Sequence, residues 1–134
     1  MMLRSVHETV LYATDIAATE RFFCDVLRLR GIGASDGLSA AFRIPEGDAV
    51  LLVFHPDHAA APNRSVPRHG TRGVGGHVAF RVDAGSLDDW QTRFANAGVA
   101  IEMDRTWERG GRSLYVRDPA GNSIELVDGE IWMR

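Results

Sequence analysis

The stretch Tyr115-Val116-Arg117-Asp118-Pro119-Ala120-Gly121-Asn122-Ser123-Ile124-Glu125-Leu126-Val127 decides the fold. It is typical of two short strands joined by a Pro/Gly turn. The stretch Ala41 to Val53 can be laid over it without a gap at a constant offset of 74 residues, and Arg, Pro, Gly, Leu and Val then coincide. A second match, at an offset of 70 residues, places His7 over His77. Two landmarks in the same order and spacing predict an internal duplication rather than a chance recurrence of turn residues.

Each repeat is predicted to fold as a strand, a helix and three further strands, so that the chain is one α+β domain of two β-α-β-β-β modules. The repeats span about 1–55 and 77–134, and the polar, Pro- and Gly-rich segment 56–76 is typical of a linker or a lid. The two helices are expected to begin at Asp15 and Ser86 and to end at Gly31 and Gly98. Strands are expected at 7–13, 32–35, 38–43, 49–55, 77–82, 100–103, 113–117 and 123–127.

The composition excludes several classes of chemistry. A chain of 134 residues with 45% hydrophobic and 25% charged residues can bury one core, so that a disordered chain is not expected. All 15 basic residues are arginine, which rules out a Schiff-base lysine and a phosphate-loop lysine. A formal net charge of -3 argues against binding to nucleic acid or an anionic membrane and favours a small-molecule partner.

The single cysteine, Cys24, can form no internal disulfide and cannot supply the paired thiolates of a structural zinc site. It falls in a helical pattern beside Phe23, which favours packing over nucleophilic chemistry. No apolar run is long enough to cross a bilayer, and the first residues lack the apolar core of a signal peptide. These features predict a protein of the reducing cytoplasm with no membrane contact.

Strand alternation predicts which side chains share a face. In the strand at 77–82, the apolar side chains at every second position should pack under the helix, which leaves His77 on the opposite face. The same reasoning in the strand at 123–127 leaves Glu125 on that face. The open face of a curved sheet is then expected to carry His7, Thr9, His77, Ser113, Tyr115 and Glu125.

His7, His77 and Glu125 are the candidate metal ligands. Two imidazoles and one carboxylate on one side of a metal ion leave adjacent positions free for substrate or water, which suits Fe²⁺ and related divalent ions. Each residue also has a simpler explanation: a surface histidine, a histidine at a glycine turn, and a solvated carboxylate. The repeat favours the metal site, because it makes His7 equivalent to His77 and Leu51 equivalent to Glu125.

The order of these residues, with Tyr115-x-Arg117-Asp118-Pro119-x-Gly121-Asn122-x-x-Glu125, resembles the vicinal oxygen chelate superfamily. That superfamily includes glyoxalase I, the extradiol dioxygenases and the fosfomycin- and bleomycin-resistance proteins, and the resemblance covers nearly the whole chain. It implies paired modules that form an open barrel, usually completed in a homodimer, and a divalent metal that binds two neighbouring substrate oxygens. The metal positions of the family fall on His7, His77 and Glu125.

Departures from the family pattern bear on the reaction. The fourth ligand of glyoxalase I falls on Leu51, which cannot bind a metal. The extradiol dioxygenases place a histidine shortly before the tyrosine that matches Tyr115, and the stretch 105–109 has none. The fosfomycin-resistance proteins bind a phosphonate with a lysine, so Arg105 or Arg112 would have to replace it here. The bleomycin-resistance proteins lack the metal ligands, which this chain retains.

The leading hypothesis is a metalloenzyme of dioxygenase or glyoxalase type that uses Fe²⁺, or else Mn²⁺, Ni²⁺ or Zn²⁺, as a Lewis acid. A non-catalytic protein that binds an antibiotic or an aromatic ligand, and a fosfomycin-type thiol transferase, are the alternatives. Tyr115 is the expected hydrogen-bond donor or acid, and Trp107 and Trp132 are candidates for a pocket wall or a dimer contact. Substrate contacts are expected from Thr9, Leu51, Arg105, Arg112 and Ser113, and His55, His58 and His69 are left as candidates for a lid or a proton donor.

The expected homodimer bears on where the ligands come from. The resemblance allows the modules to pair across subunits, so that His7 of one chain meets His77 and Glu125 of the other. Metal binding and dimerisation would then be linked.

Overall fold

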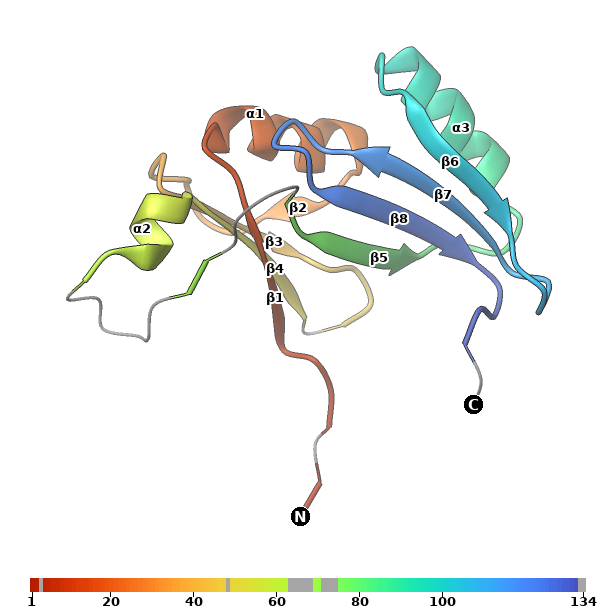
Figure 1. Ribbon diagram of the computed structural model, residues 1–134, viewed down its shortest axis with the longest axis horizontal. Helices are drawn as coiled ribbons and strands as arrows, with labels where there is room; N and C mark the ends of the chain where they lie inside the picture. Colours follow the sequence, from red (N-terminus) through yellow and green to blue (C-terminus); the bar gives the residue numbers. More distant parts are fainter. Residues whose placement is uncertain (3, 48, 63–68, 71–74, 133–134) are drawn as a thin grey trace.

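In the computed structural model the chain forms two four-stranded mixed sheets, β1-β4-β3-β2 and β5-β8-β7-β6 (Figure 1). The structure describes residues 1–2, 4–47, 49–62, 69–70 and 75–132. In each sheet the first strand pairs in parallel with the last, and the other neighbours pair antiparallel. The predicted α+β class, with two β-α-β-β-β modules in an open arrangement, is confirmed.

The elements of the first module are β1 (Glu8–Tyr12), α1 (Ile16–Arg21), the π-helical turn η1 (Phe22–Val26), β2 (Arg30–Gly31), β3 (Ser39–Arg43) and β4 (Val50–Phe54). The short helix α2 (Pro56–Ala60) follows. The second module contains β5 (His77–Arg81), α3 (Leu87–Asn96), β6 (Ile101–Thr106), β7 (Arg112–Arg117) and β8 (Ser123–Asp128).

The first helix begins where the sequence predicts and ends earlier. Asp15 Oδ1 accepts a hydrogen bond from the Ala18 N–H at 2.9 Å, which confirms the N-cap. The predicted end at Gly31 is wrong, because the chain leaves the helix at Leu27 and turns at Arg28, whose φ is +61°. Gly31 instead lies in β2, and the strand expected at 32–35 is displaced to that position.

The second helix ends as predicted at Gly98, whose φ of +68° is a left-handed value that favours glycine. Its predicted N-cap, Ser86, forms no side-chain cap. The Ser86 hydroxyl donates instead to the Asp83 carbonyl oxygen at 2.7 Å.

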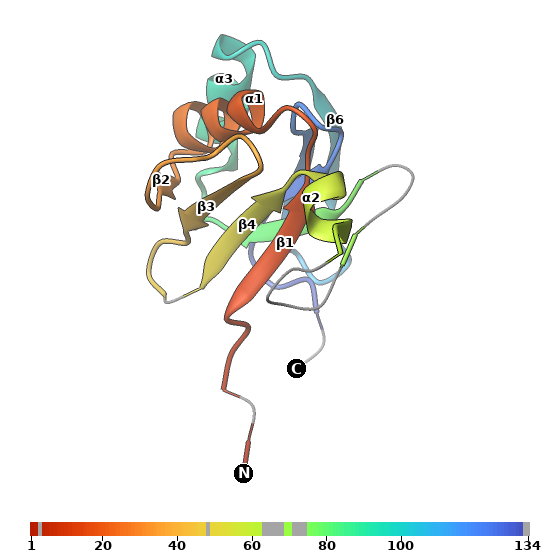
Figure 2. The ribbon, with the colours of Figure 1, turned by 90° about the vertical axis from the view of Figure 1, so that its left-hand side faces the viewer.

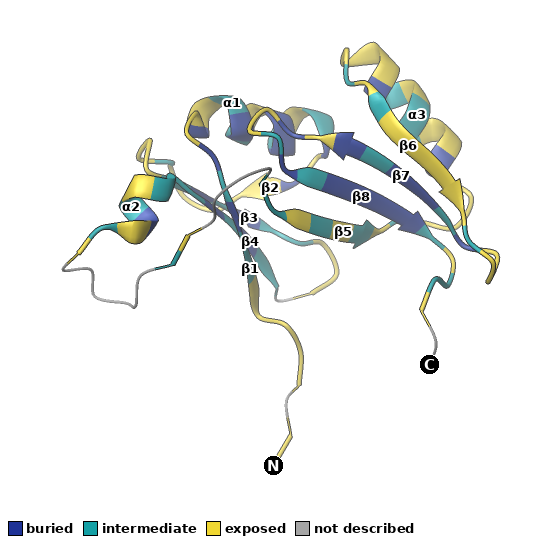
Figure 3. Ribbon diagram, in the orientation of Figure 1, coloured by how far each residue is buried: buried dark blue, intermediate teal, exposed yellow. Residues whose placement is uncertain are grey.

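Both long helices cover the same side of the sheets (Figures 1 and 2). The core between these helices and the sheets includes Phe23, Phe42 and Phe94, which are fully buried. The strand β8 is buried along almost its whole length (Figure 3). Alternate residues of β5 pack against this core, as predicted. Arg93 of α3 donates to the carbonyl oxygens of Val26 and Asp25 at 2.6 and 2.7 Å, and so joins the two helices.

The turn between β7 and β8 is hydrogen-bonded to the residue just before β5 and, through Asn122, to the end of β1. Asp118 Oδ1 accepts from the Asn122 N–H at 2.8 Å, and Asn122 Oδ1 accepts from the Gly76 N–H at 2.8 Å. Burial raises the pKa of Asp118, although its hydrogen bonds with Asn122 act in the opposite direction. The turn therefore fixes the start of β8 against the start of β5.

The segment 56–76 is more ordered at its start than a linker would be. It opens with α2, which has Pro56 in its first turn, and the His55 Nδ1 accepts from the Asp57 N–H at 3.2 Å. Residues 63–68 and 71–74 lie outside the described residues, so the expected lid is untested. No helix among the described residues is long and apolar enough to cross a membrane.

Candidate metal centre

His77 and Glu125 meet on the face of the second sheet that is turned away from α3. His77 opens β5 and lies opposite Ser123, whereas Glu125 lies two residues further along β8, opposite Ala79. The His77 Nε2 is 3.3 Å from Glu125 Oε2, and its Nδ1 lies 3.1 Å from Ser123 Oγ. The Glu125 side chain is only 6% exposed and that of His77 is 49% exposed. The predicted placement of these two residues on one face is confirmed.

The second oxygen of Glu125 lacks a partner. Within the part of the chain that the structure describes, Oε1 is a buried side-chain oxygen with no hydrogen bond. An unpaired carboxylate oxygen in a buried site is unfavourable unless a cation or a donor meets it. A divalent ion meets that requirement, and imidazole and carboxylate are ordinary ligands for such an ion. His77 and Glu125 therefore fit a metal.

Tyr115 lies directly beside this pair. It is opposite Glu125 in the β7–β8 register, and its ring stacks on that of His77 with 6.3 Å between centroids. Burial raises the pKa of Tyr115, and the Glu125 carboxylate raises it further. The hydroxyl therefore keeps its proton and can donate it to an oxygen near Glu125.

Arg105 and Trp107 extend the same face toward β6. Arg105 is opposite Ser113 in the β6–β7 register, and its guanidinium carbon lies 4.0 Å from the centroid of the Trp107 ring. Trp107 Nε1 donates to Ser113 Oγ at 2.8 Å. A pocket of about 350 Å³ is lined by these two residues together with Arg109 and Ile131, among others. The structure thus gives the predicted Arg105 a defined position and adds Trp107, for which the sequence offered two roles.

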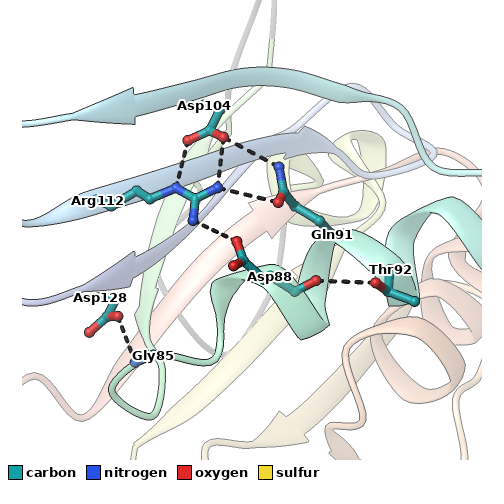
Figure 4. A network of polar contacts seen from close by, with 7 residues as sticks. All are labelled: Gly85, Asp88, Gln91, Thr92, Asp104, Arg112 and Asp128. Carbon is teal, nitrogen blue, oxygen red and sulfur yellow. Dashed lines mark hydrogen bonds and ion pairs between the residues drawn. The ribbon is translucent and has the colours of Figure 1, made fainter.

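Arg112 lies on the opposite face, contrary to the prediction of a substrate contact. Its guanidinium bonds to Asp88 and Asp104 at 2.8 Å each and to Gln91 at 3.3 Å (Figure 4). The two carboxylates raise the pKa of Arg112 above its ordinary value. The reason is alternation, because Arg112 shares its face with the core residue Leu114, toward α3, whereas Ser113 points the other way.

In the first module the prediction assigned the two faces the wrong way round. Leu11 is 1% exposed and belongs to the core. Thr9 lies two residues before Leu11 on β1, so its side chain points to the same face of the sheet. Thr9 is also opposite Leu51, itself 1% exposed and in the core. Thr9 and Leu51 therefore lie on the helix side of the sheet, where they do not face the open surface expected for a substrate.

The expected equivalence of Leu51 and Glu125 is wrong by one residue. Leu52 pairs with Ala41 and Val10, as Glu125 pairs with Tyr115 and Ala79. The cause is one additional residue in the first module between the turn glycine and the last strand. Gap-free matching of the sequence hides this shift.

His7 precedes β1 and is exposed. Its carbonyl oxygen accepts from the Val50 N–H at 2.9 Å. Among the described residues, which include all three predicted ligands, no group of three His, Cys, Asp or Glu residues is close enough to hold a metal. One chain therefore brings His77 and Glu125 together and leaves His7 apart from them.

The linker histidines lie at the first module. His69 Nδ1 is 2.6 Å from the Tyr12 hydroxyl, and its ring packs on that of Phe54 with 5.1 Å between centroids. The His58 ring also stacks on the Phe54 ring, with 6.1 Å between centroids. These histidines pack on the open face of β1 and β4, away from the pair formed by His77 and Glu125.

Comparison with known proteins agrees with this architecture. The family model described as the Glyoxalase/Bleomycin resistance protein/Dioxygenase superfamily matches residues 5–126. The chain belongs to this superfamily. The crystal structure of lactoylglutathione lyase from Agrobacterium tumefaciens is 37% identical, with 97% of each chain covered and a TM-score of 0.87.

Two further similar proteins are named as a metallothiol transferase and as a fosfomycin resistance protein. The metallothiol transferase FosB of Staphylococcus saprophyticus is 26% identical over 131 residues, which cover 97% of this chain and 80% of that protein. The fosfomycin resistance protein FosX of Mesorhizobium loti has the same fold, with 24% identity, a TM-score of 0.64, and coverage of 98% of this chain and 96% of that chain.

Proposed function

We propose that this member of the superfamily is a divalent-metal-dependent enzyme that acts on a small anionic substrate with two adjacent oxygen atoms. The observation that carries the proposal is the paired His77 and Glu125, with the second Glu125 oxygen buried and unpartnered. These residues would hold the metal, with a third ligand from another copy of the chain. When bound, the metal supplies Lewis-acid polarisation of a substrate oxygen.

Residues of the second module would then act on the bound substrate. Tyr115 retains its proton and donates to an oxygen that gains negative charge beside Glu125. Arg105, whose guanidinium lies over the Trp107 ring, binds an anionic group at the other end of the same face. Ser113, which accepts from Trp107, fixes the indole beneath the guanidinium.

Thiol chemistry is the reaction class that the relatives support best. The names metallothiol transferase and lactoylglutathione lyase both refer to a thiol or to glutathione, which is itself a thiol. We therefore prefer a thiol adduct, or a thiol together with an electrophilic substrate, over the dioxygenase chemistry expected from the sequence. The dioxygenase prediction remains one arm of the test.

The test combines metal analysis with activity. Protein prepared without chelator should hold a stoichiometric divalent metal, and Glu125→Gln should lose it while Glu20→Gln, a carboxylate on α1, keeps it. Three substrate sets are then compared with Mn²⁺, Ni²⁺, Zn²⁺ and Fe²⁺: methylglyoxal with glutathione, fosfomycin with a thiol, and catechol with dioxygen. Equal metal retention in Glu125→Gln would contradict the proposal.

A further inference from the structure

The first module has its own counterpart of His77, and it is not His7. In the second module His77 is opposite Ser123, the first residue of β8. In the first module Glu8 is opposite Val50, the first residue of β4. Glu8 therefore occupies in the first sheet the position that His77 occupies in the second.

Two further pairings fix this equivalence independently. Leu52 lies two residues beyond Val50 and pairs with Ala41, just as Glu125 lies two residues beyond Ser123 and pairs with Tyr115. Residues 41 and 115 are also matched by the Pro/Gly repeat, which needs no gap there. The matched register thus holds across β1, β3 and β4.

The face of the strand supports Glu8 as well. Leu11 is in the core, so alternation puts Glu8, Val10 and Tyr12 on the opposite, open face of the first sheet. If the alternation of β1 is extended by one residue toward the N-terminus, His7 falls on the same face of the sheet as Leu11, the face that packs on the core. Glu8 is exposed, and it takes part in none of the ion pairs found between described residues. Its carboxylate is available to a metal ion.

We infer that Glu8 of a second copy of the chain, rather than His7, completes the metal site formed by His77 and Glu125. The inference rests on the proposed function, because it concerns the third ligand of the same metal. A second copy is needed because the described residues of one chain bring no three such ligands together. The site then has one imidazole and two carboxylates.

This ligand set changes the expected metal preference. Carboxylates are hard ligands that suit Mn²⁺ and Mg²⁺, whereas imidazole suits Ni²⁺, Zn²⁺ and Fe²⁺. Two carboxylates also cancel the charge of a divalent ion, which two imidazoles and one carboxylate do not. The site should therefore favour Mn²⁺ more than a site with two histidines would, and Fe²⁺ is no longer the first expectation.

The first experiment measures metal binding by calorimetry and Mn²⁺ electron paramagnetic resonance in Glu8→Gln, His7→Ala and Glu125→Gln. Loss of a residue that only hydrogen-bonds to a metal ligand already weakens metal binding by about tenfold or more. Loss of a ligand itself should therefore weaken Mn²⁺ binding by at least about tenfold. We expect that loss in Glu8→Gln and Glu125→Gln, and wild-type affinity in His7→Ala. Circular dichroism and the melting temperature establish that each variant is folded, as the exposure of Glu8 leads us to expect.

A second variant reverses the metal preference. Glu8→His should shift the ratio of Ni²⁺ to Mn²⁺ affinities toward Ni²⁺ by at least about tenfold, because it converts the set to two imidazoles and one carboxylate. An unchanged ratio would overturn the assignment of Glu8.

A third experiment asks whether the ligands come from two chains. Glu8→Gln and His77→Ala chains are mixed in equal amounts, dissociated and allowed to reassociate. If the site is shared, mixed dimers contain one intact site each, and about a quarter of the wild-type number of Mn²⁺ sites returns. A mixture that binds no more than the separate variants overturns the shared arrangement.

The outcomes separate the two proposals. Wild-type affinity in Glu8→Gln, or loss of metal in His7→Ala alone, overturns the assignment of Glu8 and leaves the metalloenzyme standing. Wild-type affinity in Glu125→Gln overturns the proposed function itself.

Discussion

Asn122 and Tyr12, 110 residues apart in the sequence, are joined by a hydrogen bond of 2.9 Å from Asn122 Nδ2 to the Tyr12 carbonyl oxygen. The same amide group donates to Asp118 Oδ2 at 2.8 Å, and its oxygen accepts from the Gly76 N–H. One fully buried side chain therefore holds β1, the start of β5 and the turn before β8 together. The positions of His77 and Glu125 depend on this junction, although none of the hydrogen bonds of Asn122 between described residues goes to either of them.

Replacing Asn122 should destabilise the whole chain. Asn122→Ala removes the hydrogen bonds to the Gly76 N–H, the Tyr12 carbonyl oxygen and the buried Asp118 Oδ2, so the free energy of unfolding should fall by about 2–4 kcal/mol. Urea denaturation followed by circular dichroism measures the change. Asn96→Ala, at an exposed position of α3, is the matched control and should change it by less than about 0.5 kcal/mol. Equal effects of the two variants would show that the junction contributes nothing particular.

The one-residue shift between the modules can be tested with neighbouring leucines. Leu51→Glu buries an unpaired carboxylate in the core and should lower the free energy of unfolding by several kcal/mol, with or without added divalent metal. Leu52→Glu places the carboxylate on the open face, where Glu125 lies in the other module, and should cost far less. Melting temperatures of both variants, with and without Mn²⁺, provide the measurement. Metal-dependent recovery of Leu51→Glu would restore the equivalence that the register contradicts.

The same shift explains what could be predicted from the sequence. Alternation with a clear polar and apolar face assigned β5 and β8 correctly, because His77 and Glu125 interrupt otherwise apolar patterns. In β1 both faces are apolar, so alternation alone could not choose between Thr9 and Val10, and only the burial of Leu11 decides. The Pro/Gly turns revealed the duplication but concealed the extra residue before β4, because that residue follows the matched Pro and Gly and Leu and Val still coincide at the same offset.

Two other predictions, the role of Arg112 and the end of the first helix, were wrong for reasons that a local sequence pattern does not contain. Arg112 was expected at the substrate because arginines bind anions, yet its partners are Asp88 and Asp104, which only the packing of α3 on the sheet brings near. The end of the first helix at Arg28 requires a left-handed residue that is not glycine. The Arg112 ion pairs depend on tertiary packing, and the left-handed Arg28 departs from the ordinary preference for glycine at the end of a helix.

The two arginines offer a matched pair for activity. Arg105→Gln removes a cation from the open face and should raise KM for an anionic substrate by roughly tenfold or more, since hydrogen bonds to charged groups contribute about 1.5–3 kcal/mol. Arg112→Gln, one strand away on the opposite face, should leave KM unchanged. Steady-state kinetics with whichever substrate proves active provide the measurement. A larger rise in KM for Arg112→Gln than for Arg105→Gln would reverse the assignment of the two faces.

The Arg112 cluster also predicts how stability responds to acid. Hydrogen bonds from Arg112 hold the pKa of Asp104 below its ordinary value. In the unfolded chain an aspartate has a pKa of about 4. Just below that pH the unfolded state therefore binds a proton while Asp104 in the folded state is still deprotonated. The stabilisation by this carboxylate is therefore complete above about pH 5 and is lost as the pH falls through the lowered pKa.

Unfolding free energies of the wild type and Asp104→Asn, measured from neutral to acid pH, should differ by a constant amount above about pH 5 and converge below about pH 4. Glu108→Gln, whose carboxylate takes part in no ion pair between described residues, is the control and should show no such convergence. A difference between wild type and Asp104→Asn that persists unchanged into acid would mean that Arg112 stabilises the fold through packing rather than through its charge.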